Sequence, residues 1–325
     1  MTTNRLISSN FGLVPERTAR RNSVEQALSS VFVQHGYAEV TLPMYEYYDI
    51  LKAATHNFRD ESIISFTDRT NGRQLVLRPD FTPQVCRMVA GYHNDLELPI
   101  RMFYRGTVFR NVNIDEGSKA EKYQIGCERY AENGSNEIDG DLELLLCVTA
   151  CMDKIELTDY RIVLGDAAFL SRVFSMLGGT AAEYMDILQR KRLHALKPFI
   201  ERLETSPELK ALLEYLPVSF GGRDEFDKLM TLASFDLKLK SRCEYLKSLF
   251  GRAMEMGFPA DKLVFDAGEM RGLEYYTGIS FEILHSVTGE LLGGGGRYDT
   301  LMEKFNLDYT ACGMALHLEA IENLF

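Results

Sequence analysis

Two β-prone runs joined by a polar turn constrain the fold of this chain more than any other feature. Residues 101–109 alternate polar and apolar side chains, as a half-buried strand does, and a second such run covers residues 122–130. An antiparallel hairpin sends alternate side chains to one face of the sheet. The sequence therefore predicts a central hairpin on which Arg110, Gln124 and Glu128 converge.

The segments before and after this hairpin predict further helices and strands. Pro15 suits the first turn of a helix, and His35-Gly36 ends it. An Asn71-Gly72 pair is a strong hairpin signal between two β-prone segments. The other elements expected up to residue 165 are strands at 40–43, 62–67, 74–77 and 160–165, and helices at 84–90 and 139–152.

The expected fold class is α+β, with an antiparallel sheet of about six or seven strands flanked by helices. The core is expected in two parts, 1–165 and 260–325, separated by a mostly helical insertion at 166–259. Helices are predicted in the insertion at 170–177, 181–193, 196–203, 208–215 and 237–256. Strands are predicted after it at 262–266, 278–284 and 290–292, followed by a strand that turns into a helix over 311–320.

Composition and charge exclude several classes of protein. The chain has 325 residues and 46% hydrophobic content, enough for a large core. Its formal net charge of −11 argues against a broad nucleic-acid surface, because phosphate binding uses clustered Lys and Arg. No run has the length of a membrane-spanning helix and the start lacks a signal-peptide pattern, so we expect a cytoplasmic protein.

Neither the cysteines nor the histidines predict a metal site, and no cofactor is expected. The six histidines, His317 among them, lack metal-ligand spacing and are expected at the surface or packed in the core. The six cysteines lack paired spacing and are expected to be reduced and buried. They are Cys86, Cys127, Cys147, Cys151, Cys243 and Cys312.

Three motifs in order along the chain resemble the histidyl-tRNA synthetase branch of the class II aminoacyl-tRNA synthetases. The first runs from Arg78-Pro79-Asp80 through Phe109-Arg110-Asn111 to residues 124–128, the second is Arg271-Gly272-Leu273-Glu274-Tyr275-Tyr276, and the third is Gly295-Gly296-Arg297-Tyr298-Asp299. The resemblance implies the class II catalytic fold with a helical insertion in the place seen here. It also implies a dimer through the segment around Pro43, which is similar to motif 1 of that class, although a simple strand end is the plainer interpretation of this proline.

The residue types of these motifs suit a zwitterion with a polar ring, such as histidine. The set comprises the carboxylates Asp80, Glu128 and Glu274, the guanidinium groups Arg110, Arg271 and Arg297, and the neutral groups Thr82, Gln124, Tyr275 and Tyr276. The resemblance implies that Asp80, Thr82 and Gln124 surround the ammonium group, that Arg110 holds the carboxylate, and that Glu128, Tyr275 and Tyr276 contact the imidazole. Arg271 matches an arginine that serves catalysis in the synthetase. Taken singly, Arg110 and Arg271 could instead pair with core carboxylates, and Tyr275 could only pack.

Several positions depart from the synthetase pattern where ATP would bind. The resemblance places Ala320 where motif 3 has an arginine over the γ-phosphate, and Val112 where motif 2 has a glutamate. The loop that follows carries basic residues in the family this chain resembles, whereas here it holds Asp115 and Glu116, with only Lys119 and Lys122 positive. Phosphoryl chemistry depends on positioned cations, so these changes predict binding without adenylation. The anticodon-binding domain of the synthetase is also expected to be missing.

A chain with intact histidine contacts and a weakened ATP site resembles the regulatory subunits of ATP phosphoribosyltransferase. The resemblance implies a partner, the short catalytic subunit of that enzyme, which this chain would activate and make sensitive to histidine in the first step of histidine biosynthesis. It implies no chemistry of its own, no tRNA and no membrane. A stand-alone histidine-activating ligase is the alternative, supported by Arg271 and weakened by Ala320. A sensor of uncharged tRNA is a third possibility, which the acidic balance disfavours.

Overall fold

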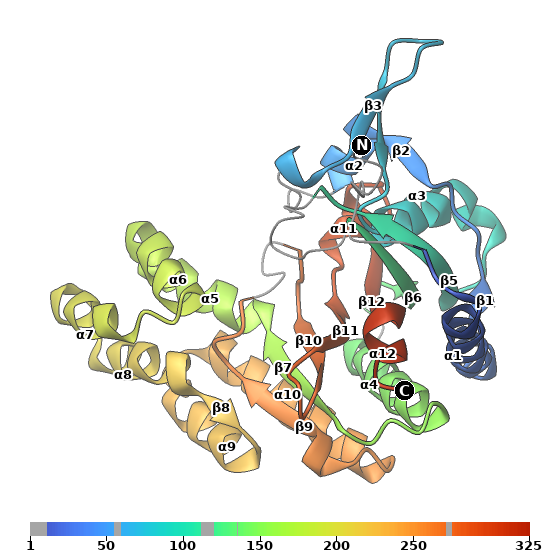
Figure 1. Ribbon diagram of the computed structural model, residues 1–325. Helices are drawn as coiled ribbons and strands as arrows, with labels where there is room; N and C mark the ends of the chain where they lie inside the picture. The colour runs from blue at the N-terminus through green and yellow to red at the C-terminus, as the bar shows by residue number, and fades with distance from the viewer. Residues whose placement is uncertain (1–11, 55–59, 112–119, 135, 271–274) are drawn as a thin grey trace, which may run out of the picture.

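The computed structural model describes residues 12–54, 60–111, 120–134, 136–270 and 275–325, and shows a large sheet flanked by helices (Figure 1). Within these ranges the strand order is β1-β5-β6-β12-β11-β10-β7-β9-β8. The strands are β1 (Ala38–Glu39), β5 (Ile100–Phe109), β6 (Glu121–Glu132), β7 (Tyr160–Asp166), β8 (Phe220–Gly221), β9 (Leu263–Asp266), β10 (Ile279–His285), β11 (Leu291–Arg297) and β12 (Tyr309–His317).

The α+β class is confirmed, but the expectation of a purely antiparallel sheet is wrong. β1 pairs with β5 and β7 pairs with β9 in parallel, while the other neighbours are antiparallel. The sheet also exceeds the six or seven strands expected. The additional strands, β1 and β8, contain two residues each, which is too short for a period of two to be visible in the sequence.

Helices cover the sheet and make up most of residues 166–259. Their bounds are α1 (Pro15–Gln34), α2 (Tyr48–Ala54), α3 (Thr82–Tyr92), α4 (Glu137–Lys154), α5 (Ala167–Leu177), α6 (Ala181–Gln189), α7 (Leu193–Arg202), α8 (Pro207–Tyr215), α9 (Arg223–Leu232), α10 (Leu237–Glu255), α11 (Thr300–Glu303) and α12 (Leu318–Glu322). The expected helices are all present, although α6 ends before residue 193. Helix α9 was missed because its sequence is mostly polar, with Phe226 and Leu229 among its few buried residues. No helix in the described ranges is both long and apolar enough to cross a membrane.

A second, small sheet has the order β2-β4-β3, with β2 (Tyr45–Tyr47), β3 (Ser65–Thr67) and β4 (Gln74–Leu77). The Asn71-Gly72 hairpin is confirmed, because β3 and β4 are antiparallel and Thr67 lies opposite Gln74. This hairpin projects from the body of the molecule (Figure 1). The strand expected at 40–43 is wrong: the Val40 amide still donates to the carbonyl oxygen of Phe103 on β5 at 2.9 Å, but residues 40–43 form no strand. Side chains from another part of the chain hold carbonyl groups of this segment, as described below.

The central hairpin separates two hydrophobic cores. Phe103, Ile125 and Cys127 belong to the larger core, with α1, α4 and much of the insertion. Tyr104 and Tyr130 belong to the second core, with α3 and α11. Successive residues of a strand point to opposite faces, so the hairpin contributes side chains to both cores. The expected pairing of β5 with β6 is confirmed, with Met102 opposite Glu128.

The glycine run 293–296 lies inside β11, which extends beyond the strand expected at 290–292. It pairs with β10 on one side and β12 on the other. A Cβ at Gly295 would collide with the carbonyl group of Gly313, so the neighbouring backbone leaves no room for a side chain. This close backbone packing leaves a strip of the sheet without side chains.

Candidate functional site

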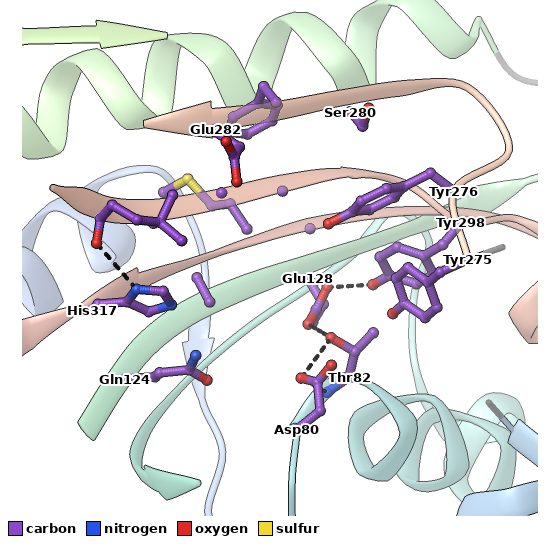
Figure 2. A pocket seen from close by; sticks show the side chains of 18 of the residues that line it. Asp80, Thr82, Gln124, Glu128, Tyr275, Tyr276, Ser280, Glu282, Tyr298 and His317 are labelled. Carbon is purple, nitrogen blue, oxygen red and sulfur yellow. Dashed lines mark hydrogen bonds between the residues drawn. The ribbon is translucent and has the colours of Figure 1, made fainter. Parts of the chain in front are cut away.

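The pocket lies on the face of the sheet where this bare strip runs (Figure 2). One row across the strands pairs Tyr104 with Gly126, Gly126 with Ala315, Ala315 with Gly294, and Gly294 with Glu282. Large side chains stand at the ends of the row and small ones in its middle. This arrangement leaves a cavity of about 410 Å³.

The structure brings most of the expected site residues together. Seven of the eight residues expected to bind histidine line the cavity: Asp80, Thr82, Arg110, Gln124, Glu128, Tyr275 and Tyr276. The eighth, Arg271, lies outside the described residues, as does Glu274. Asp80 and Thr82 come from the start of α3, Arg110, Gln124 and Glu128 from the central hairpin, and the tyrosines from the segment before β10.

Glu128 lies at the centre of the hydrogen-bond network in the pocket and is 1% exposed. Its Oε1 accepts hydrogen bonds from Thr82 Oγ1 at 2.7 Å and from the Tyr104 hydroxyl at 3.1 Å, and its Oε2 accepts from the Tyr298 hydroxyl. Gly313 lies opposite on β12, and a Cβ there would overlap the Glu128 carboxylate. Burial raises the pKa of Glu128 to about 8, although the hydroxyl donors lower it.

Asp80 lies beside this network, next to Thr82 and Arg110. The Thr82 amide donates to Asp80 Oδ1 at 3.3 Å, which places the carboxylate at the first turn of α3. Burial raises the pKa of Asp80, and the charge of Arg110 opposes this shift. Arg110 Nε donates to the carbonyl group of Pro79 at 3.4 Å. The pair can therefore present a carboxylate and a guanidinium to one small zwitterion.

Tyrosine rings form one wall of the pocket. Tyr275 packs against Tyr276 edge to face at 5.1 Å and against Tyr298 at 5.2 Å. The Tyr275 hydroxyl is buried and has no hydrogen-bond partner among the described groups. An unsatisfied buried hydroxyl is costly, so this group is suited to a ligand or a water molecule in the pocket.

The sequence interpretation missed several residues of the cavity lining. They are Tyr104, Glu269, Ser280, Glu282, Tyr298 and His317. His317, expected to be an ordinary surface or core residue, faces the cavity opposite Gln124, and its Nδ1 lies 3.3 Å from the carbonyl oxygen of Leu291. Burial lowers its pKa to about 4. Tyr298 stood within a recognised motif, but the pairing of β12 that brings His317 here has no local sequence signal.

Arg297 is a correction to the expected site, because it does not line the pocket. Its guanidinium is 2% exposed and pairs with Asp141 of α4 at 2.7 Å and with Asp299 at 3.1 Å. The Tyr245 hydroxyl of α10 donates to the other oxygen of Asp141 at 2.5 Å. Arg297 therefore joins the sheet to α4 and, through Asp141 and Tyr245, to α10, and it does not line the pocket.

The described lining is predominantly acidic. It contains four carboxylates, Asp80, Glu128, Glu269 and Glu282, against one permanent cation, Arg110. Ala320, which the resemblance aligned with the motif 3 arginine, lies on α12 and is buried. Among the described residues, no group of His, Cys, Asp and Glu is arranged to hold a metal ion. The electrostatics suit an ammonium or imidazole group better than a triphosphate.

The raised pKa of Glu128 predicts a pH dependence of stability. The folded protein holds this proton more tightly than the unfolded chain, so the stabilising contribution is complete below a pH of about 4.3 and is lost as the pH rises toward 8. We expect the parent to lose stability relative to Glu128→Gln by up to about 1.4 kcal/mol per pH unit in this window. Urea unfolding of both proteins at several pH values measures the difference. A difference that is independent of pH would mean that Glu128 is ionised throughout.

Comparison with known proteins agrees with this fold. The family model described as Histidyl-tRNA synthetase matches residues 11–321. The ATP phosphoribosyltransferase regulatory subunit of Carboxydothermus hydrogenoformans is 32% identical over 95% of this chain and 92% of its own length. The corresponding subunit of Geobacter metallireducens is 28% identical over 95% of this chain and 71% of its own length.

Solved structures show the same fold. An ATP phosphoribosyltransferase regulatory subunit/histidyl-tRNA synthetase from Bacillus halodurans superposes with a TM-score of 0.89 at 23% identity, covering 99% of this chain and 83% of that one. A histidine–tRNA ligase subunit from Alicyclobacillus acidocaldarius has a TM-score of 0.81 at 24% identity, covering 99% and 97%. The sheet, the central hairpin and the pocket thus define a class II synthetase-like protein. The chain belongs to the histidyl-tRNA synthetase family, in its branch of ATP phosphoribosyltransferase regulatory subunits.

Proposed function

We propose that this chain is the non-catalytic regulatory subunit of an ATP phosphoribosyltransferase. It activates the short catalytic subunit, which condenses ATP with phosphoribosyl pyrophosphate in the first step of histidine biosynthesis, and it confers feedback inhibition by histidine. The observation that carries this proposal is the relative named as such a subunit, which is 32% identical and aligns over nearly the whole of both chains.

The pocket is the proposed histidine site. Asp80, Thr82 and Gln124 take the ammonium group, Arg110 takes the carboxylate, and Glu128 with the two tyrosines takes the imidazole ring. The buried Glu128 carboxylate and the unpartnered Tyr275 hydroxyl support this assignment, because a ring with two polar nitrogens can satisfy both. Arg271 belongs to the proposed site by its place in the motif.

The proposal includes no aminoacylation and no tRNA partner. The acidic lining and the methyl group of Ala320 support this part, because adenylation needs cations around the phosphates of ATP. A dimer formed through the segment around Pro43 and a cytoplasmic location also belong to the proposal. The six free cysteines suit a reducing compartment. The division into a core of two parts and an insertion remains a proposal about domains.

Histidine regulates the assembly in this scheme by binding two of its states unequally. A ligand shifts an equilibrium only through its difference in affinity for the two states. Histidine in the pocket would favour the state in which the partner is inhibited. The regulatory chain then needs no chemistry of its own.

Phosphoribosyl-ATP formation by the short catalytic subunit from the same organism tests the proposal. We expect the rate to increase when this chain is added and to fall again as histidine is titrated. A folded chain that leaves the rate unchanged would contradict the proposed role. Histidine-dependent exchange of pyrophosphate into ATP, measured in parallel, should be absent; its presence would support the ligase instead.

A further inference from the structure

One short segment of the chain contacts the pocket on one side and a surface segment on the other. Within residues 78–84, Asp80 and Thr82 line the cavity, whereas Arg78 and Gln84 reach the chain that connects β1 with β2. We call residues 42–45, the end of that connection and the first residue of β2, the strap. The same few residues of backbone therefore carry both the ligand contacts and the contacts to the strap.

Arg78 holds the strap through its backbone carbonyl groups. Its Nη1 donates to the carbonyl oxygens of Leu42 at 3.0 Å and Pro43 at 3.2 Å, and its own amide donates to that of Met44 at 2.9 Å. Its Nε donates to the carbonyl oxygen of Thr107 on β5 at 2.8 Å. All these acceptors are backbone groups, and Arg78 is 4% exposed. A buried guanidinium is costly unless it is hydrogen-bonded, so this geometry is closely defined.

A continuous series of contacts connects Arg78 with the centre of the pocket. The guanidinium lies over the ring of Phe81 at 4.0 Å, and Phe81 stacks on Tyr104 at 4.2 Å with an angle of 16°. The Tyr104 hydroxyl donates to Glu128. Close-packed side chains move together because no space lets one shift alone. A ligand that repositions the Glu128 carboxylate therefore acts on Tyr104, Phe81 and Arg78 in turn.

The strap lies at the surface, so a change in its position would alter a surface that a partner protein can contact. Met44 is 57% exposed and Tyr45 is 53% exposed. Gln84 adds a second tie, since its Nε2 donates to the carbonyl oxygen of Pro43 at 3.1 Å. The strap is contacted from the buried side through its backbone and presents apolar side chains on its outer side. The shape of this surface therefore depends on residues 78–84 beneath it.

We propose that Arg78 is a positioning residue that couples occupancy of the pocket to the conformation of the strap. The proposal rests on the proposed function, because it takes histidine as the ligand. In this proposal Asp80, Thr82 and Glu128 contact the ligand. The packed side chains of Tyr104, Phe81 and Arg78 transmit the change to the strap.

A single introduced tryptophan tests this coupling. The chain contains no tryptophan, so Tyr45→Trp provides a unique fluorescent reporter on the strap. We expect histidine to shift the fluorescence emission of this variant. The shift should saturate at the same histidine concentration as the binding measured by calorimetry. Adding Arg78→Met should abolish the emission response while the affinity for histidine stays within about tenfold. Arg73→Met is the matched control, because Arg73 stacks at 3.5 Å over Tyr47 of β2 but is exposed; its response should persist.

Phe81→Leu provides an independent variant if Arg78→Met fails to fold. It removes the stacked ring in the middle of the series and retains the arginine, and it should also abolish the response. Histidine binding without any emission change in Tyr45→Trp, or a response that survives either substitution, would overturn the coupling and leave the histidine site intact. Absence of calorimetric binding to the parent would overturn the proposed ligand together with the coupling.

Discussion

Replacing Glu128 by glutamine should weaken histidine binding by about ten- to a hundredfold, because a charge-assisted hydrogen bond contributes about 1.5–3 kcal/mol. Glu128 is the buried acceptor of three hydroxyl groups. Burial raises its pKa to about 8, and a cationic imidazole bound beside it would favour the ionised carboxylate. Glutamine preserves the size of the side chain and removes the charge. Isothermal titration calorimetry with histidine measures the loss.

Two further variants separate a specific contact from a general effect of charge. Glu282→Gln removes a carboxylate from the far end of the same cavity and should change the affinity by less than about threefold. Gly313→Ala retains Glu128 but places a methyl group against its carboxylate, so it should reproduce much of the loss. Unchanged binding by Glu128→Gln would place histidine elsewhere on the protein. Equal losses in Glu282→Gln and Glu128→Gln would indicate only the overall negative potential.

Replacing Asp141 by alanine should destabilise the folded chain by about 3 kcal/mol or more, because it leaves the buried Arg297 guanidinium without its main partner. Asp141 is 0% exposed, and it also accepts the hydrogen bond from Tyr245 of α10. Asp299 still contacts Arg297 in the variant, which places the expected loss at the lower end of the range for broken buried pairs. The midpoint and slope of urea unfolding measure the change.

An exposed ion pair on the same protein provides the control. Asp186 of α6 pairs with Arg190 at 2.6 Å and with Arg192 at 2.8 Å, both just after the helix, and all three side chains are exposed to solvent. Asp186→Ala should therefore cost no more than about 1 kcal/mol. Asp141→Asn, which can keep part of the hydrogen bonding, should fall between the two alanine variants. If Asp141→Ala and Asp186→Ala cost the same, the buried network does not hold the insertion to the core as the structure indicates.

The helices and most of the long strands were predictable from local patterns, and the exceptions have physical reasons. Strands β5 and β6 were predictable from their β-prone sequences, although much of both faces is buried because a hydrophobic core lies on each side. The glycines of β11 have no side chains to show an alternation of polar and apolar residues, so the strand was missed at residues 293–296. The segment at 40–43 looked β-prone, but Arg78 and Gln84 occupy its carbonyl groups, and no local pattern encodes these long-range contacts.

The sequence by itself determined the family, the central hairpin and seven of the described residues that line the pocket. Motifs and strand periodicity are local properties of the sequence, so they can be recognised without knowing how the chain packs. Only the tertiary structure decided how strands distant in sequence pair. That pairing brings His317 opposite Gln124, places small residues between Tyr104 and Glu282, and turns Arg297 away from the ligand toward Asp141. These outcomes depend on register and burial across segments far apart in the chain, and a slip of one residue would reverse which side chains face the cavity.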